Sequence, residues 1–329
     1  GHTGGTVDKL ESIRGVNLTC STERFIANAK EMGLSIVAQS QDMAPADKLL
    51  YALRNVTATV DAIPLIASSI MSKKLAAGAD GIVLDVKSGT GAFMATPQDA
   101  IDLAETMVKI GTDAGRRVVA LVTGMDQPLG RAVGNALEVE EAIATLRGEG
   151  PADLTDLVLT MGSEMLVMAR VARSIDDARQ RLETAIADGS GLLKLKAYVA
   201  AMGGDASLID HPENLPTAKA RVPVSNDAQG YVSAIDALAV GMASKALGAG
   251  RQVKEDAIDP SAGVLLHKKL GDRTEAGAPL ATVCANGDAA VIKAAVAQIR
   301  SAYTIQAGPF EVPPLVYARI TKEGIEVLA

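Results

Sequence analysis

The sequence predicts an α/β fold, in which a domain with a mixed or mainly parallel sheet carries a small helical lobe and a β-rich α+β C-terminal unit. Three observations predict this class. Between residues 80 and 220, short apolar runs alternate with amphipathic helices, as in parallel sheets. Two helical segments in tandem precede this stretch, and strand patterns with glycine turn signals follow it. The regions we expect are 1–38 (start of the α/β domain), 39–79 (helical lobe), 80–220 (α/β domain) and 221–329 (C-terminal unit).

The first two regions are predicted mainly from helix signals. STERFIANAKEMG has helical spacing and ends at Gly33, since glycine readily adopts the conformation that closes helices. Residues 34–39 form a short apolar run with strand character. In the lobe, one helix begins near Pro45, with Asp47 at the positive end of its dipole. The next begins near Asp61, tolerates Pro64 in its first turn and ends at Gly78.

Two buried strands are expected in the α/β domain, over residues 81–87 and 117–123. The glycine-bearing loop SGTGAF and an amphipathic helix over 97–115 connect them. Further helices are expected at 133–148, 152–172, 175–188 and 191–202, and the C-terminal unit has turn signals at Gly230, Gly271 and Gly277 and a helix over 288–302.

The composition excludes several classes of function. A net charge of −7 and an aromatic content of 2% leave neither a basic face nor stacking platforms for nucleic acid. No apolar stretch approaches the ~20 residues that cross a bilayer. Cys20 and Cys284 are expected to be reduced thiols of a cytoplasmic protein. His2, His211 and His267 do not cluster in the sequence, so we expect no metal site.

The chain opens with GHTGGTVDKL, which has no basic segment followed by an apolar core and is therefore not a signal peptide. It begins inside a glycine-rich loop and has no initiator Met. We therefore expect a truncated chain. In this loop, glycines let the backbone approach an anion, N–H groups at the helix start near Asp8 point toward it, and Thr6 adds a hydroxyl. The alternative is a plain glycine turn.

Two side-chain pairs on the lobe helices are candidates for ligand binding. Tyr51 and Arg54 are three residues apart, and Ser69 and Lys73 are four apart, so each pair shares a helix face. Taken singly, each pair has a structural alternative: an Arg stem packed beside a Tyr, and a surface Lys near a helix end. Together with the glycine loop, they form a site that suits a flat ligand with two carbonyl oxygens and a ring N–H, beside a phosphate.

Four segments carry a resemblance to a known family. They are GHTGGTVDKLESI, the long segment from APADKLLYALRNV to DVKSGTGAFM, QPLGRAVGNALEVEEAI, and GVLLHKKLGDRTEAGAPLAT. The chain resembles pyrimidine-nucleoside and thymidine phosphorylases over nearly its whole length. The resemblance implies a helical lobe that binds the base, facing an α/β domain that binds phosphate. It implies that the base-binding residues are Tyr51, Arg54, Ser69 and Lys73, that the pocket or its covering loop contains Val60, Ile66 and Phe93, and that Thr6 binds phosphate.

The resemblance also implies a reaction, reversible phosphorolysis of thymidine or uridine to free base and (deoxy)ribose 1-phosphate. Arg54 and Lys73 would be the catalytic cations that meet the charge of the departing base. Inorganic phosphate is a co-substrate, no cofactor or metal is expected, and family members are homodimers. Asn55 departs from the family's Asp after the Arg. Since the family's first phosphate loop would precede Gly1, we expect this chain to be inactive by itself.

Two other functions stay open at this point. An anthranilate-type phosphoribosyltransferase would need an acidic magnesium pair, and Asp8 with Glu11 are too few. A biotinyl or lipoyl carrier resembles GDRTEAGAPLAT, but the stretch that should hold the modified Lys, SAIDALAVG, has none. Thymidine and uridine present the same carbonyl edge, so the sequence leaves the preference between them undecided.

Overall fold

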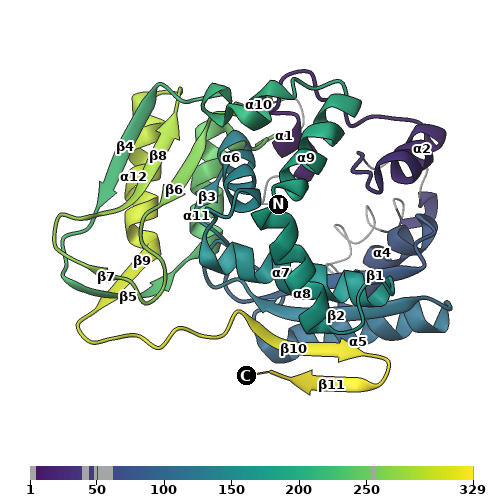
Figure 1. Cartoon of the computed structure of the whole chain (residues 1–329). Helices are drawn as coiled ribbons and strands as arrows, with labels where there is room; N and C mark the ends of the chain where they lie inside the picture. The colour runs from purple at the N-terminus through teal and green to yellow at the C-terminus, as the bar shows by residue number, and fades with distance from the viewer. Residues whose placement is uncertain (1–4, 39–43, 48–49, 51–61, 254–255, 329) are drawn as a thin grey trace. The chain divides into compact units, whose positions relative to one another are not determined.

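The structure is a computed structural model that describes residues 5–38, 44–47, 50, 62–253 and 256–328 (Figure 1). By its internal contacts, the chain divides into two compact units. The four-region division expected from the sequence stays a prediction. The first unit comprises residues 1–38, 126–155 and 184–312, and the second comprises residues 39–125, 156–183 and 313–329.

The second unit is built on a four-stranded mixed sheet. Strand β1 (Gly81–Ser88) pairs in parallel with β2 (Arg117–Gly124), as the two buried runs predicted. Strand β10 (Val316–Thr321) pairs antiparallel with β2, and β11 (Gly324–Val327) pairs with β10. The sequence did not indicate that this hairpin joins β2. The α/β class with a mixed sheet is confirmed.

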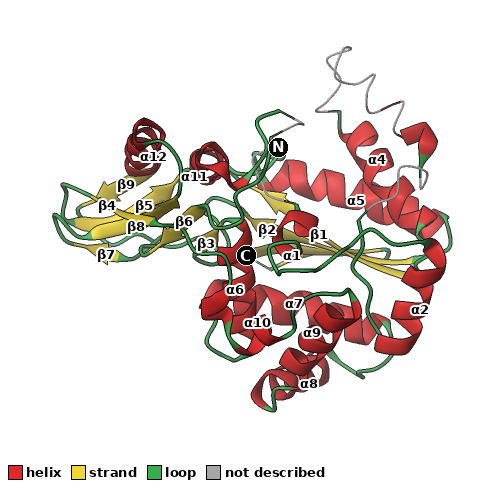
Figure 2. Cartoon of the chain, turned by 90° about the horizontal axis from the view of Figure 1, so that it is seen from above, coloured by secondary structure: helices red, strands yellow, loops and turns green. Residues whose placement is uncertain are grey.

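Helices α4 (Ile63–Ala76) and α5 (Pro97–Asp113) cover one face of this sheet, as Figure 2 shows. Both begin where the sequence indicates. Pro64 lies in the first turn of α4, and the Thr96 side chain caps α5 by accepting a hydrogen bond from the backbone N–H of Asp99. A Cβ added at Gly111 of α5 would lie 2.4 Å from the Val118 side chain. Glycine therefore lets this helix approach β2 closely.

The opposite face of the sheet contacts α7 (Ala152–Met168). Arg319 of β10 forms an ion pair with the buried Glu164 of α7, with 2.5 Å between Nε and Oε1, and this contact raises the pKa of the guanidinium. The helix was expected to continue to residue 172 but ends at Met168. Arg170 lies just beyond, with a φ of 59° that a right-handed helix does not allow. Helix α8 (Ile175–Ala187) follows.

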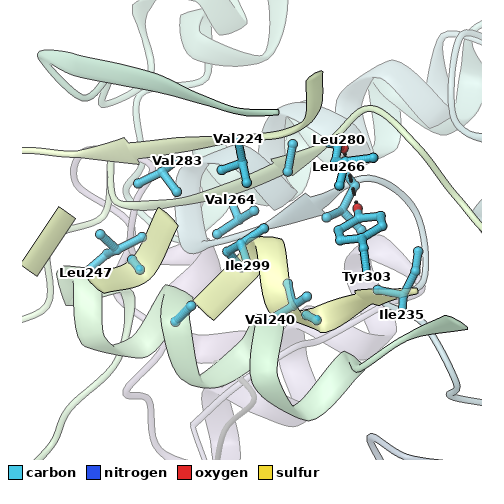
Figure 3. Close-up of a cluster of buried hydrophobic side chains, with 14 of the residues drawn as sticks. Val224, Ile235, Val240, Leu247, Val264, Leu266, Leu280, Val283, Ile299 and Tyr303 are labelled. Atoms are coloured by element: carbon cyan, nitrogen blue, oxygen red, sulfur yellow. Dashed lines mark hydrogen bonds between the residues drawn. The ribbon is translucent and has the colours of Figure 1, made fainter. Parts of the chain in front are cut away.

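The first unit contains the β-rich C-terminal region, arranged in two antiparallel sheets. Helices α11 and α12 pack against them around an apolar core (Figure 3). The buried Tyr303 completes this core, and its hydroxyl donates to the carbonyl of Lys268 over 3.0 Å. The strands are β3 (Ala132–Val133), β6 (Gly263–Leu266), β8 (Pro279–Ala285) and β4 (Ala220–Ser225) in one sheet, and β7 (Arg273–Thr274), β5 (Gly230–Ile235) and β9 (Tyr303–Gln306) in the other; the helices are α11 (Ala237–Ser244) and α12 (Ala289–Ala302).

A second, helical core in the first unit surrounds the buried Tyr198. The strand expected over residues 34–39 is wrong for its described part, 34–38, which is irregular. The backbone N–H of Ile36 bonds to the Tyr198 hydroxyl, which in turn donates to the carbonyl of Ile36. A side chain thus satisfies the groups that a neighbouring strand would otherwise pair. The helices are α1 (Thr6–Leu10), α2 (Thr22–Met32), α6 (Asn135–Leu146), α9 (Ser190–Ala201) and α10 (Ser207–Asp210). None of the described helices is both long enough and apolar enough to cross a membrane.

The core of the β-rich region gives a test of stability. Ile299 of α12 is fully buried among the strands, so Ile299→Ala should lower the free energy of unfolding by about 2–5 kcal/mol. Val291→Ala, at an exposed position of the same helix, should change it by less than about 0.5 kcal/mol. Urea titration followed by circular dichroism measures both variants. Equal effects would show that this helix does not pack as described.

Candidate active site

Helix α4 presents Ile66, Ser69 and Lys73 at positions three and four residues apart, which share one side of a helix. The Lys73 ammonium donates to the Ser69 hydroxyl over 3.0 Å and to the Ser69 carbonyl over 3.1 Å. It also forms an ion pair with Asp47 at 2.5 Å. A hydroxyl, an ammonium and a carboxylate are therefore in direct contact.

The three side chains of this cluster differ in how far they are exposed to solvent. Ser69 is only 7% exposed, whereas the Lys73 side chain keeps 33% of its surface accessible. The Asp47 carboxylate is mostly buried and holds the ammonium from one side. The three acceptors, which are the Ser69 hydroxyl, the Ser69 carbonyl and the Asp47 carboxylate, match the three donor hydrogens of the ammonium, so a ligand that bonds to Lys73 replaces one of them. The sequence indicated only that Asp47 lies at the positive end of a helix dipole. Its contact with Lys73 joins two separate helical segments, and sequence spacing does not predict such a contact.

Phe93 lies on the loop that follows β1 and is 78% exposed, an unusual position for a large aromatic side chain. The loop folds back on itself, since Ser88 and Met94 form a β-bridge and the N–H of Gly89 bonds to the carbonyl of Met94 over 3.0 Å. Gly89 adopts a φ of 123°, which side chains rarely tolerate. The glycine-bearing loop thus returns the chain to the end of β1 with the aromatic side chain facing solvent.

The remaining predicted site residues are partly outside the described residues and partly described one by one. Tyr51, Arg54 and Val60, and the departure at Asn55, lie outside the described residues. Thr6 is exposed at the start of α1 and belongs to the first unit. Ile66 is partly buried and packs against the core beneath α4.

A second polar cluster was missed by sequence reasoning. It lies where the parallel strands β1 and β2 end. The Lys87 ammonium lies 2.8 Å from a carboxylate oxygen of Asp85 and donates to the Thr123 hydroxyl over 3.0 Å. The Thr123 hydroxyl donates to the other oxygen of Asp85 over 2.5 Å. The available signal was two charges two residues apart in an otherwise apolar strand, which places both on one face.

The first unit contains a cavity of about 730 Å³ beside a buried cation. Lys269 is 9% exposed, and its ammonium donates to the carbonyls of Pro128 and Gly130 and pairs with Asp153 at 2.9 Å. Burial lowers the pKa of Lys269, although Asp153 favours its charged form. At the same cavity, burial raises the pKa of Glu141, which accepts hydrogen bonds from two backbone N–H groups. Across the described ranges, no three His, Cys, Asp or Glu side chains gather as metal ligands would.

Comparison with known protein families shows the class of protein to which this chain is similar. Residues 1–192 match the family described as "Glycosyl transferase family, a/b domain", in accord with the α/β sheet and its covering helices. Residues 231–306 match the "Pyrimidine nucleoside phosphorylase C-terminal domain", which accounts for the β-rich region.

Relatives then place the chain within that class. The pyrimidine-nucleoside phosphorylase of Staphylococcus haemolyticus is 55% identical over 286 residues, which are 87% of this chain and 66% of the relative. That of Staphylococcus epidermidis strain ATCC 35984 is 54% identical with the same coverage. That of Bacillus subtilis strain 168 is 49% identical over 322 residues, which are 98% of this chain and 74% of the relative. The chain belongs to the pyrimidine-nucleoside phosphorylase family, and its match spans 66% of the length of these staphylococcal relatives.

Replacement of the buried cation should destabilise the protein. Lys269→Met leaves Asp153 without its partner, so the free energy of unfolding should fall by about 3–5 kcal/mol. The folded state holds the Lys269 proton less tightly than the unfolded chain, whose lysine pKa is about 10.4. Between the lowered pKa of Lys269 in the folded state and the lysine pKa of the unfolded chain, the free energy of unfolding of the wild type rises with pH. The variant has no ammonium at this position and should lack this rise.

Chemical denaturation at several alkaline pH values measures both effects. Lys293→Met, at an exposed position of α12, is the matched control and should keep the wild-type stability and pH slope. A Lys269→Met protein with wild-type stability would contradict the structural role assigned to this ammonium.

Proposed function

We propose that this protein carries out the phosphorolysis of pyrimidine nucleosides, with uridine and thymidine as substrates. That the 329 residues are inactive by themselves stays a prediction. An oxygen of inorganic phosphate bonds to C1′ of the pentose while the N-glycosidic bond breaks, and the bonding electron pair leaves with N1 of the base. The products are the free base and (deoxy)ribose 1-phosphate. The observation that carries this proposal is the contact of Lys73 with Ser69 and Asp47 on a helix whose sequence resembles that of the family.

The difficult part of the reaction is the departure of the base, because its negative charge spreads onto the carbonyl oxygens. Lys73 and Arg54 are the cations assigned to that charge. Oriented donors act most strongly where charge develops, and removal of one typically costs about 2.7–4 kcal/mol of transition-state stabilisation. The Ser69 hydroxyl can bond to the edge of the ring. Asp47 holds the Lys73 ammonium in one orientation, which reduces the reorganisation needed when the base leaves.

The other assignments complete the proposed site. Tyr51 binds the base, and Val60, Ile66 and Phe93 line the base pocket or the loop over it. Thr6 binds phosphate. The exposure of Phe93 on a tight loop supports its role, since an aromatic ring at the surface is available to cover a flat ligand.

The wider properties follow the family resemblance. We assign phosphate as a co-substrate with no further cofactor, a homodimeric assembly and a cytoplasmic location. Division into an α/β domain, a base-binding lobe at 39–79 and a C-terminal unit from 221 remains part of the proposal. The carrier and phosphoribosyltransferase alternatives are not favoured, because the family that matches the C-terminal region and the named relatives are pyrimidine-nucleoside phosphorylases.

Substitution of one lysine tests the proposal. In a complete enzyme, Lys73→Met and Arg54→Ala should each lower kcat for phosphate-dependent release of uracil or thymine by about a hundredfold or more. Lys74→Met removes an adjacent, exposed ammonium from the same helix and should leave kcat unchanged. Base release is followed by ultraviolet absorbance with and without phosphate. Near-normal turnover of uridine and thymidine in Lys73→Met or in Arg54→Ala would refute the proposal.

A further inference from the structure

The cluster of Asp85, Lys87 and Thr123 lies at the carboxyl ends of two parallel strands. In open α/β sheets, ligands bind beyond these ends. In β1 the buried residues alternate with the exposed Asp85 and the partly buried Lys87, so both charges lie on the less covered face of the strand. A partly desolvated ion pair contributes little net stability. The pair therefore adds little to stability and keeps accessible surface at the ends of the strands.

The hydrogen bonds of the cluster form a closed triangle. Thr123, which is 0% exposed, donates to one oxygen of Asp85 and accepts from Lys87, and Lys87 pairs with the other oxygen of Asp85. This arrangement holds the ammonium and the carboxylate in one orientation. The described part of the chain supplies the ammonium with no third partner, and the Lys87 side chain keeps 28% of its surface exposed. Two acceptors leave one of the three Lys87 donor hydrogens for a ligand, and the Asp85 side chain keeps 30% of its surface exposed.

The chemistry of this pair selects a class of ligand. The two charges compensate each other, so the pair attracts neither phosphate nor a cation strongly. A hydroxyl group fits, because it accepts a hydrogen bond from an ammonium and donates one to a carboxylate at the same time. Hydrogen bonds to charged groups are stronger than neutral ones.

The position of the pair agrees with the proposed site. Lys87 is the residue before Ser88, which bridges to Met94, the neighbour of Phe93. The loop assigned to the base therefore returns to the strand end that carries the pair. In a nucleoside, the base is bonded to a pentose, and the hydroxyl groups of the pentose are neutral groups that can both donate and accept hydrogen bonds.

We propose that Asp85 and Lys87, held by Thr123, bind the 3′-hydroxyl of the nucleoside. This inference rests on the proposed function, because the ligand is its substrate. Uridine and thymidine both carry this hydroxyl, so the contact serves either one. Lys87 and Asp85 are substrate-binding residues here, and Thr123 is a positioning residue.

The test compares two ligands with and without the hydroxyl. Binding of uridine and of 3′-deoxyuridine to the full chain is measured by isothermal titration calorimetry. Lys87→Met should weaken uridine binding by roughly tenfold to a hundredfold, the range for a hydrogen bond to a charged group, and should change 3′-deoxyuridine binding by less than about threefold. Asp85→Asn, nearly isosteric, should show a smaller loss confined to uridine.

Lys109→Met is the matched control, because Lys109 forms an exposed ion pair with Asp113 on α5 in the same unit; it should bind both ligands as the wild type does. Thermal unfolding checks that each variant folds, and Asp85→Asn carries the test if Lys87→Met does not. Equal losses for both ligands, no loss for either, or a wild-type chain that binds uridine no better than 3′-deoxyuridine would overturn the inference. Phosphate-dependent base release by the same preparations tests the proposed function separately.

Discussion

The eight residues of β1 pair in parallel with the eight residues of β2, and the helices α4 and α5 and the strand β10 pack around this pair. Parallel strands need a crossover, which α5 supplies over one face of the sheet. The same face receives α4, so the helix that carries Ser69 and Lys73 rests on the alternate residues Ile82, Leu84 and Val86. The residues between them point to the other face, where Asp85 and Lys87 meet Thr123.

The three lysine contacts share a principle and differ in their surroundings. Lys269 is almost fully enclosed, and its ammonium bonds to two carbonyls and a carboxylate, so its role is structural. Lys73 and Lys87 are also tied to carboxylates, yet both retain exposed surface. A counter-ion that orients an ammonium without enclosing it leaves the ammonium accessible to a ligand. The exposed surface therefore distinguishes Lys73 and Lys87, the candidate ligand-binding residues, from the buried Lys269.

Local signals explain what the sequence predicted well. Pro64 and Thr96 mark helix starts within one turn, and Ser69 meets Lys73 because residues four apart share a helix face. Contacts between segments that are far apart in the sequence could not be predicted from such local signals. The pairing of β10 with β2, the contact of Asp47 with Lys73 and the approach of Thr123 to Lys87 each join separate elements. The irregular stretch at 34–38 was mistaken for a strand because its apolar pattern is the same whether its backbone pairs with a strand or with the Tyr198 hydroxyl.

The hairpin of β10 and β11 has a consequence for synthesis. Strand β2 emerges from the ribosome long before β10, and the β-rich region of the first unit is translated between them. During this interval, the side of β2 that will bond to β10 offers unpaired backbone groups, and such edges promote association between nascent chains. Completion of the sheet must therefore follow translation of the β-rich region, because β10 and β11 are the last strands of the chain.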